Sequence, residues 1–124
     1  MSEKTKKRFG VWMDSHDATV VGFIPPATEF TVIGRAKNPG VGANSNENAA
    51  NNLEKTLAQK YFKEIGRLLV NAEEVHVTGT GTIQEQFKHY LAESPPFKKT
   101  VVTDSTSNAM SETKLVEFVS SHFN

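Results

Sequence analysis

The chain has 124 residues, about the length of one domain, and its 37% hydrophobic and 23% charged residues are the composition of a globular protein. It contains no cysteine, which excludes a disulfide scaffold, a cysteine-ligated zinc site and a thiol nucleophile. Its 14 basic and 14 acidic residues cancel, so it lacks the basic excess that usually marks a protein gripping long nucleic acid by charge.

The N-terminal segment is basic but has no apolar stretch behind it, so it does not read as a secretory signal. No apolar run approaches the roughly 18 residues that a membrane span needs. We therefore expect a cytoplasmic protein that contacts no membrane. Residues 1–8 are expected to be a flexible basic stub, and residues 9–124 a single α/β domain. The stub is either a solvated tail or a contact for RNA phosphates, through Lys4, Lys6, Lys7 and Arg8.

The first half of the chain predicts three strands and a loop. Residues 9–13 and 18–24 are apolar runs joined by a short polar stretch, a pattern typical of a β-hairpin. After two prolines, residues 29–34 predict a third strand. Residues 37–52 offer almost nothing to bury and are rich in Asn and Gly, which predicts a long loop. Such a loop is either a disordered connector or an element that orders on contact with RNA or protein.

The second half alternates helices and strands. A helix is predicted at 53–70, because its apolar residues recur at helical spacing and include Leu57, Tyr61, Ile65 and Leu68. The next expected elements are a strand at 75–77, a glycine turn at 79–81, a helix opened by a capping box of Thr82 and Glu85, a strand at 99–103, a turn at 104–108 and a helix at 111–122.

The predicted order is β-β-β-α-β-α-β-α, which defines an α/β fold with a mixed sheet. The first three strands should be antiparallel, and the later ones parallel because helices connect them. This order resembles the core of ribonuclease H-like folds.

Three segments together resemble the middle domain of eukaryotic and archaeal peptide-release factors and of the ribosome-rescue factor Pelota. They are the opening hairpin at 9–22, the long loop before a helix rich in Lys and Glu, and the strand with its glycine turn at 75–81. The resemblance covers about residues 8–121 and extends to stand-alone bacterial copies of this translational-machinery-like domain. It implies a ribonuclease H-like fold and an association with the ribosome, tRNA or another translation component.

One departure from that family concerns catalysis. Release factors carry Gly-Gly-Gln in the long loop, whereas this loop has separated glycines and no Gln. Hydrolysis of peptidyl-tRNA is therefore not implied, and we expect a non-catalytic binding module without a cofactor. Its expected contacts with RNA or a partner are Lys37, Asn38, Gly40, Gly42, Asn44 and Asn46.

Two other functions stay open. A metal-dependent nuclease on the same fold would need several carboxylates converging around Asp14, and the candidates are Asp17, Glu73 or Glu74, and Asp104. The favoured interpretation is that Asp14 and Asp17 stabilise a hairpin turn, which leaves no predicted metal site. The third possibility is an interaction protein unrelated to translation.

The glycine turn and the histidines are weaker candidates. Gly79, Thr80, Gly81 and Thr82 lead into a helix whose free N–H groups can bind a phosphate or carboxylate, although no nucleotide-binding motif is complete. The four histidines have no zinc-binding spacing, and His76 is expected to be a core or cross-strand residue.

Overall fold

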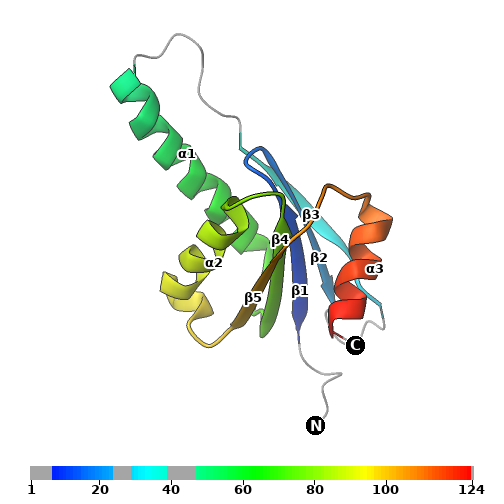
Figure 1. The fold of residues 1–124 in the computed structure, drawn as a ribbon. Coiled ribbons are helices and arrows are strands. Elements are labelled where there is room, and N and C mark those ends of the chain that lie inside the picture. The colour runs from blue at the N-terminus through cyan, green and yellow to red at the C-terminus, as the bar shows by residue number, and fades with distance from the viewer. Residues whose placement is uncertain (1–6, 24–28, 39–46, 124) are drawn as a thin grey trace.

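Five strands form one mixed sheet in the order β3-β2-β1-β4-β5 (Figure 1). The computed structural model describes residues 7–23, 29–38 and 47–123, and their side chains except those of 47–55. The elements are β1 (Arg8–Met13), β2 (Asp17–Phe23), β3 (Thr31–Lys37), α1 (Glu47–Leu68), β4 (Glu74–Gly79), α2 (Ile83–Glu93), the 3-10 turn η2 (Pro95–Phe97), β5 (Val101–Thr106) and α3 (Glu112–Phe123).

The strand directions agree with the sequence prediction. β1, β2 and β3 pair antiparallel in succession, whereas β4 lies parallel to both β1 and β5. The helical crossovers before β4 and β5 account for the parallel half, because parallel strands need a long connection. The predicted α/β class, mixed sheet and element order are confirmed.

The neighbouring strands β1 and β4 are buried on both faces because helices cover both sides of the sheet. α1 and α2 lie on one side and α3 on the other (Figure 1). On the α1–α2 side, Val11 belongs to one core cluster with Ile65 and Phe87; on the α3 side, Trp12 belongs to another with Val119. This two-sided burial explains why residues 9–13 form a continuous apolar run rather than an alternating one.

The predicted loop at 37–52 is too long. β3 continues to Lys37 and α1 begins at Glu47, six residues before the predicted start at 53. Asn disfavours a helix by only about 0.7 kcal/mol or less per residue, and adding residues to an existing helix is favourable once its first turn has formed. Ala49 and Ala50, between the asparagines, are strong helix formers, so the segment joins α1.

The predicted turn at 104–108 is also wrong in its first half. β5 continues through Asp104 to Thr106, and each of its residues pairs with one of β4, ending at Gly79 opposite Thr106. The hydroxyl side chains that suggested a turn instead bond to β4, as described below. Tertiary pairing therefore outweighs the weak strand preference of these polar residues.

Candidate functional site

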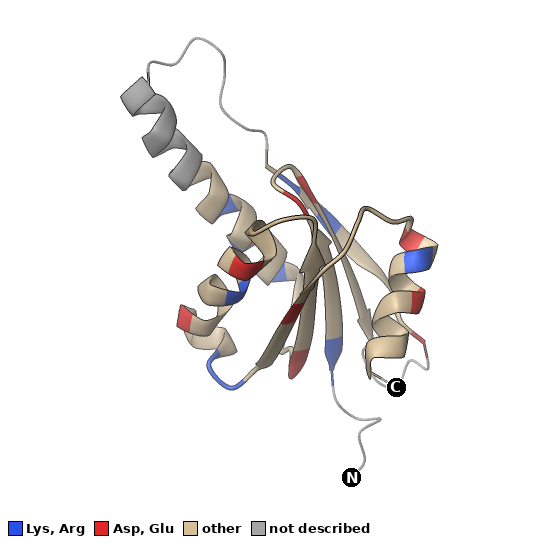
Figure 2. Cartoon of the chain, in the orientation of Figure 1, with Lys and Arg blue, Asp and Glu red and all other residues tan. Residues whose placement is uncertain are grey.

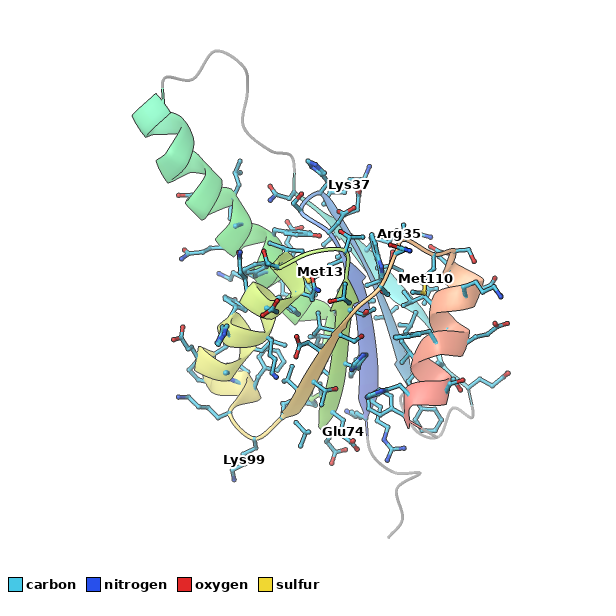
Figure 3. All side chains as sticks on the ribbon, in the orientation of Figure 1. Met13, Arg35, Lys37, Glu74, Lys99 and Met110 are labelled. Carbon is cyan, nitrogen blue, oxygen red and sulfur yellow. The ribbon has the colours of Figure 1, made fainter. Side chains whose placement is uncertain are left out.

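Several of the sequence-predicted contact residues meet at one end of the sheet, which we call the carboxyl edge. β1 ends at Met13 opposite Gly79, the last residue of β4, and Asp17 at the start of β2 pairs with Lys37 at the end of β3. The carboxyl edge thus comprises the turn at 14–17, Lys37, Asn38 and the turn at 79–82. In Figure 3, Lys37 lies at the opposite end of the sheet from Glu74 and Lys99.

Asp14 stabilises the tight turn between β1 and β2. One carboxylate oxygen, Oδ1, accepts hydrogen bonds from the backbone N–H groups of His16 (2.8 Å) and Asp17 (2.7 Å). The backbone of Asp14 also donates to the Asp17 carbonyl at 2.9 Å. The turn role favoured from the sequence is therefore confirmed.

Helix α1 is fastened to this turn by Tyr61. Its hydroxyl donates to the Asp14 carbonyl oxygen at 2.9 Å, while the side chain is almost fully buried. Burial, followed by the nearby carboxylates of Asp14 and Asp17, raises the pKa of the Tyr61 hydroxyl above its ordinary value. The hydroxyl therefore keeps its proton and remains a donor, which fixes the position of the turn relative to the helix.

The carboxylates considered for a nuclease site are spread over the sheet. Glu73 and Glu74 lie at its other end, where Glu73 accepts a bond from the Lys7 backbone and Glu74 pairs with Arg8 at 3.1 Å. Asp104 pairs with Lys88 at 3.2 Å, on the α2 side. Within the described part of the chain, no three His, Asp or Glu residues are placed to hold a metal ion.

The first two residues of the predicted contact loop lie at the end of β3. Lys37 is exposed, and the backbone N–H of Asn38 donates to the His16 carbonyl at 2.7 Å, which ties the loop to the Asp14 turn. Four of the expected contacts lie outside the described residues: Gly40, Gly42, Asn44 and Asn46.

The glycine turn divides into a buried and an exposed part. Gly79 is buried, and its carbonyl accepts bonds from the Ser107 backbone (2.7 Å) and from the Gln84 side chain (3.3 Å). A Cβ at Gly79 would lie 2.2 Å from the Met13 carbonyl oxygen, so only glycine allows β1 and β4 to approach this closely. Thr80, Gly81 and Thr82 are exposed.

The capping box predicted from Thr82 does not form. Thr82 occupies the N-cap position, but its φ of −105° and ψ of −7° are helical rather than extended, and its side chain makes no capping hydrogen bond. The extended backbone is what normally lets the hydroxyl reach the N–H groups of the first turn. Anion binding at this turn stays a prediction.

Lys7 and Arg8, which were predicted to belong to the basic stub, are part of the folded domain and lie away from the carboxyl edge. Arg8 begins β1, and the Lys7 carbonyl accepts hydrogen bonds from the Glu73 and Glu74 backbones, so both residues belong to the domain. These pairings stabilise the start of β1 beside β4. Lys4 and Lys6 lie outside the described residues. The six residues of β1 separate Lys7 and Arg8 from the carboxyl edge by about 20 Å.

A row of polar side chains on β4 and β5 was missed in the sequence. His76, only 4% exposed, bonds through Nδ1 to the Thr103 hydroxyl (2.7 Å) and through Nε2 to the Ser105 hydroxyl (2.9 Å). The row continues from Ser105 to Thr78 and on to Ser107. His76 is thus a cross-strand residue, as expected. Its hydroxyl partners occupy alternate positions of β5: Thr103 was predicted to be in a strand, whereas Ser105 was predicted to be in a turn.

The ring of His76 also contacts α3. It stacks on His122 with the ring centroids 3.9 Å apart and lies 5.9 Å from Phe118. Burial, and secondarily the neighbouring His122, lowers the pKa of His76 to about 4, with Asp104 opposing. At neutral pH the imidazole is therefore uncharged, with one ring nitrogen as donor and the other as acceptor.

No protein-family model and no curated protein matches this chain, but solved structures do. Pelota from Thermoplasma acidophilum aligns with 97% of the chain at a TM-score of 0.61 and 21% identity. Pelota from Archaeoglobus fulgidus also aligns with 97%, at 0.60 and 14% identity. The archaeal translation termination factor aRF1 aligns with 93%, at 0.55 and 14% identity.

The chain spans about one third of the length of each of these proteins: 34%, 32% and 34%. The match confirms the resemblance predicted from the sequence, and the fold is that of the Pelota and aRF1 domain. At these identities the likeness is one of fold. Within the described part of the chain, no helix has the length and apolar character needed to cross a membrane.

Proposed function

We propose that this protein is a non-catalytic binding module that associates with the ribosome, tRNA or another structured RNA of translation. The observation that supports this most is the fold, which is shared over 93% of the chain with a translation termination factor and over 97% with Pelota. A cytoplasmic location is part of the proposal, because translation takes place there.

We assign the contact to the carboxyl edge. Lys37 is an exposed cation at the point where the loop leaves the sheet, and the exposed turn at 80–82 lies at the same end. The backbones of Asn38 and Asp14 are fixed by hydrogen bonds, so this edge presents a pre-organised base to a partner. Pre-organised contacts bind more tightly because less ordering is needed on association.

No reaction is included in the proposal. The loop lacks the Gly-Gly-Gln of release factors, and Asp14 accepts hydrogen bonds from its own turn. Of the other candidate carboxylates, only Asp17 shares this turn, whereas Glu73, Glu74 and Asp104 lie elsewhere on the sheet. These observations favour binding over a ribonuclease H-like nuclease. No observation specifically favours an interaction protein outside translation.

Sedimentation with ribosomes from the protein's own cells tests the proposal. We expect saturable co-sedimentation that weakens as salt is raised, because phosphate contacts are screened. Lys37→Glu, or replacement of residues 39–46 by a Gly/Ser segment of equal length, should weaken the association at least tenfold. The matched control is Lys114→Glu, which reverses an exposed charge on α3. Absence of co-sedimentation, or equal loss in the control, would contradict the proposal.

A further inference from the structure

A groove between α1 and the end of α2 has an apolar floor and a basic rim. It measures about 360 Å³, and its lining is mostly apolar. α1 contributes Lys63, Gly66 and Arg67, while Tyr90, Pro96 and Phe97 come from α2 and η2. Ligand pockets start at roughly 300 Å³, so the space suits one or two side chains.

The groove lies away from the carboxyl edge. Its walls are the last turns of α1 and α2, just before the chain enters β4 and β5, whose first residues are Glu74 and Val101. The groove and the carboxyl edge are therefore at opposite ends of the sheet. An inference about the groove does not depend on the proposed function.

Gly66 is the feature that packing does not explain. A glycine inside a helix is less stable than alanine by roughly 0.5–1 kcal/mol. A Cβ at Gly66 would meet only the Phe97 ring, at 3.6 Å and 3.8 Å, which is ordinary contact. At Gly10 and Gly79, by contrast, a Cβ would come within 2.2 Å of another atom. Gly66 therefore keeps the floor of the groove open at a small cost in stability.

The rim supplies charge complementarity to an acidic ligand. Lys63 and Arg67 are exposed and form no ion pair with any described residue. Lys60, one turn earlier, is exposed on the same side of the helix. Figure 2 shows that basic residues are spread along the described part of α1. Complementary charges at the rim of an interface mainly give specificity and faster association.

We propose that this groove binds a short segment of a partner protein that places one large apolar side chain next to Asp or Glu. The apolar side chain would occupy the space over Gly66 and Phe97, and the carboxylates would face Lys63 and Arg67. A buried apolar anchor surrounded by a polar rim is the usual arrangement of such contacts.

The aromatic geometry favours protein over RNA. Stacking of a base needs an open ring face. Phe97 is only 9% exposed, and Tyr90 already packs on Phe87 (6.1 Å between centroids) and Phe62 (5.6 Å). A side chain of a partner protein can instead contact ring edges and the exposed prolines at the mouth of the groove.

Labelled octapeptides test the proposal by fluorescence anisotropy with the full chain. One set has a central Leu, Ile, Phe, Tyr or Trp flanked by Asp and Glu; matched sets carry Lys flanks or a central Ala. We expect at least one acidic peptide with a large centre to bind ten or more times tighter than both of its matched versions. Equal binding across the sets, or no binding by any acidic peptide, would overturn the proposal.

Two variants locate the binding. Gly66→Leu fills the floor and should abolish it, while the double reversal Lys63→Glu and Arg67→Glu should weaken it at least tenfold. Lys114→Glu is the control and should change nothing; thermal melts check that each variant is folded. Binding that survives in folded Gly66→Leu overturns the proposal. An octauridylate that binds and is lost in the same variants overturns it in favour of RNA.

Discussion

The side chain of His76 shows how burial sets protonation at the scale of one residue. Thr103 and Ser105 satisfy both ring nitrogens, and neither hydroxyl carries a charge that would stabilise an imidazolium. Burial lowers the pKa of His76 most, the neighbouring His122 lowers it further, and Asp104, which also pairs with Lys88, opposes them. The pKa of His76 falls to about 4 as a result.

This shift predicts that stability depends on pH. In the unfolded chain His76 binds its proton near pH 6.5, whereas in the folded chain it does so only near pH 4. Between these values the unfolded state holds more protons, so stability is full above pH 6.5 and declines as the pH falls towards 4. The loss amounts to about 3 kcal/mol, at 1.36 kcal/mol per pKa unit.

Urea unfolding between pH 7.5 and 4.5 measures this effect. His76→Gln does not titrate in the range, so the difference in unfolding free energy between the wild type and this variant should shrink as the pH falls. Other titrating groups contribute to both proteins and cancel. A difference that stays constant with pH would show that His76 does not carry the dependence.

Gly10 gives a second residue-scale prediction. A Cβ at this position would lie 2.2 Å from Cγ2 of Val119, which is fully buried on α3. Gly10→Ala should therefore destabilise by about 1–3 kcal/mol, the usual cost of overpacking. The cost should fall when Val119→Ala makes room, which a double-mutant cycle measures. Gly66→Ala, whose Cβ meets nothing closer than 3.6 Å, is the matched control and should not destabilise.

At the scale of elements, one stripe of apolar side chains on α1 holds this helix against the rest of the domain. Tyr61 and Ile65 are almost fully buried, as predicted, whereas Leu57 and Leu68 are only partly so. The helix packs on β3, β2 and α2, and Ile65 belongs to the same core cluster as Phe9 and Phe87. Its apolar contacts fix the rotation of the helix about its axis.

Ile65→Asp tests that register. It would bury an uncompensated carboxylate where the wild-type side chain is 0% exposed, and the expected loss is several kcal/mol, enough to unfold a domain of ordinary stability. Glu64→Asp, the control on an exposed neighbour, should change the melting temperature little. A normal melting temperature for Ile65→Asp would mean that the helix is rotated.

The sequence predicts the elements that have a local apolar pattern and fails for those that depend on contacts with residues distant in the sequence. The apolar runs at 9–13 and 18–24 and the helical stripe through Ile65 are such local patterns. They were sufficient to predict a mixed sheet with helices packed on it. The strand β5 was predicted to end at residue 103 because the hydroxyl residues that follow favour a turn, and only the pairing of Ser105 with Thr78 and His76 places them in the strand. No local sequence pattern indicates a contact such as that of Ser105 with Thr78, which are 27 positions apart.

The same distinction applies to the candidate sites. Asp14 was recognised because a side chain bonding its own turn is a local event. The groove could not be predicted from the sequence, since Gly66 and Phe97 are 31 positions apart and lie in separate elements. Sites assembled from separate elements become visible only once the packing of those elements is known.

At the scale of the whole molecule, a binding module without catalysis should not be stabilised by divalent metal ions. Any ligand that binds only the folded state stabilises it by RT ln(1 + [L]/Kd), which is about 2.7 kcal/mol at a hundredfold excess over Kd. A nuclease centre at Asp14 would therefore raise the melting temperature saturably with Mg²⁺ or Mn²⁺. We expect no such rise, because Oδ1 of Asp14 already accepts two backbone hydrogen bonds and Glu74 lies at the far end of β4.

The variant Asp14→Ala separates two roles of this carboxylate: stabilising the turn between β1 and β2, and binding a metal ion as the nuclease hypothesis requires. It should lower stability by about 1–3 kcal/mol without any metal, because two backbone donors of the turn lose their partner. Thermal melts of both proteins are then recorded across a series of Mg²⁺ and Mn²⁺ concentrations, with Ca²⁺ at equal ionic strength to account for screening. The shift between the two melting temperatures should remain constant throughout. A gap that widens saturably with Mg²⁺ or Mn²⁺ would mean that Asp14 binds the ion, and would revive the nuclease hypothesis against the binding module.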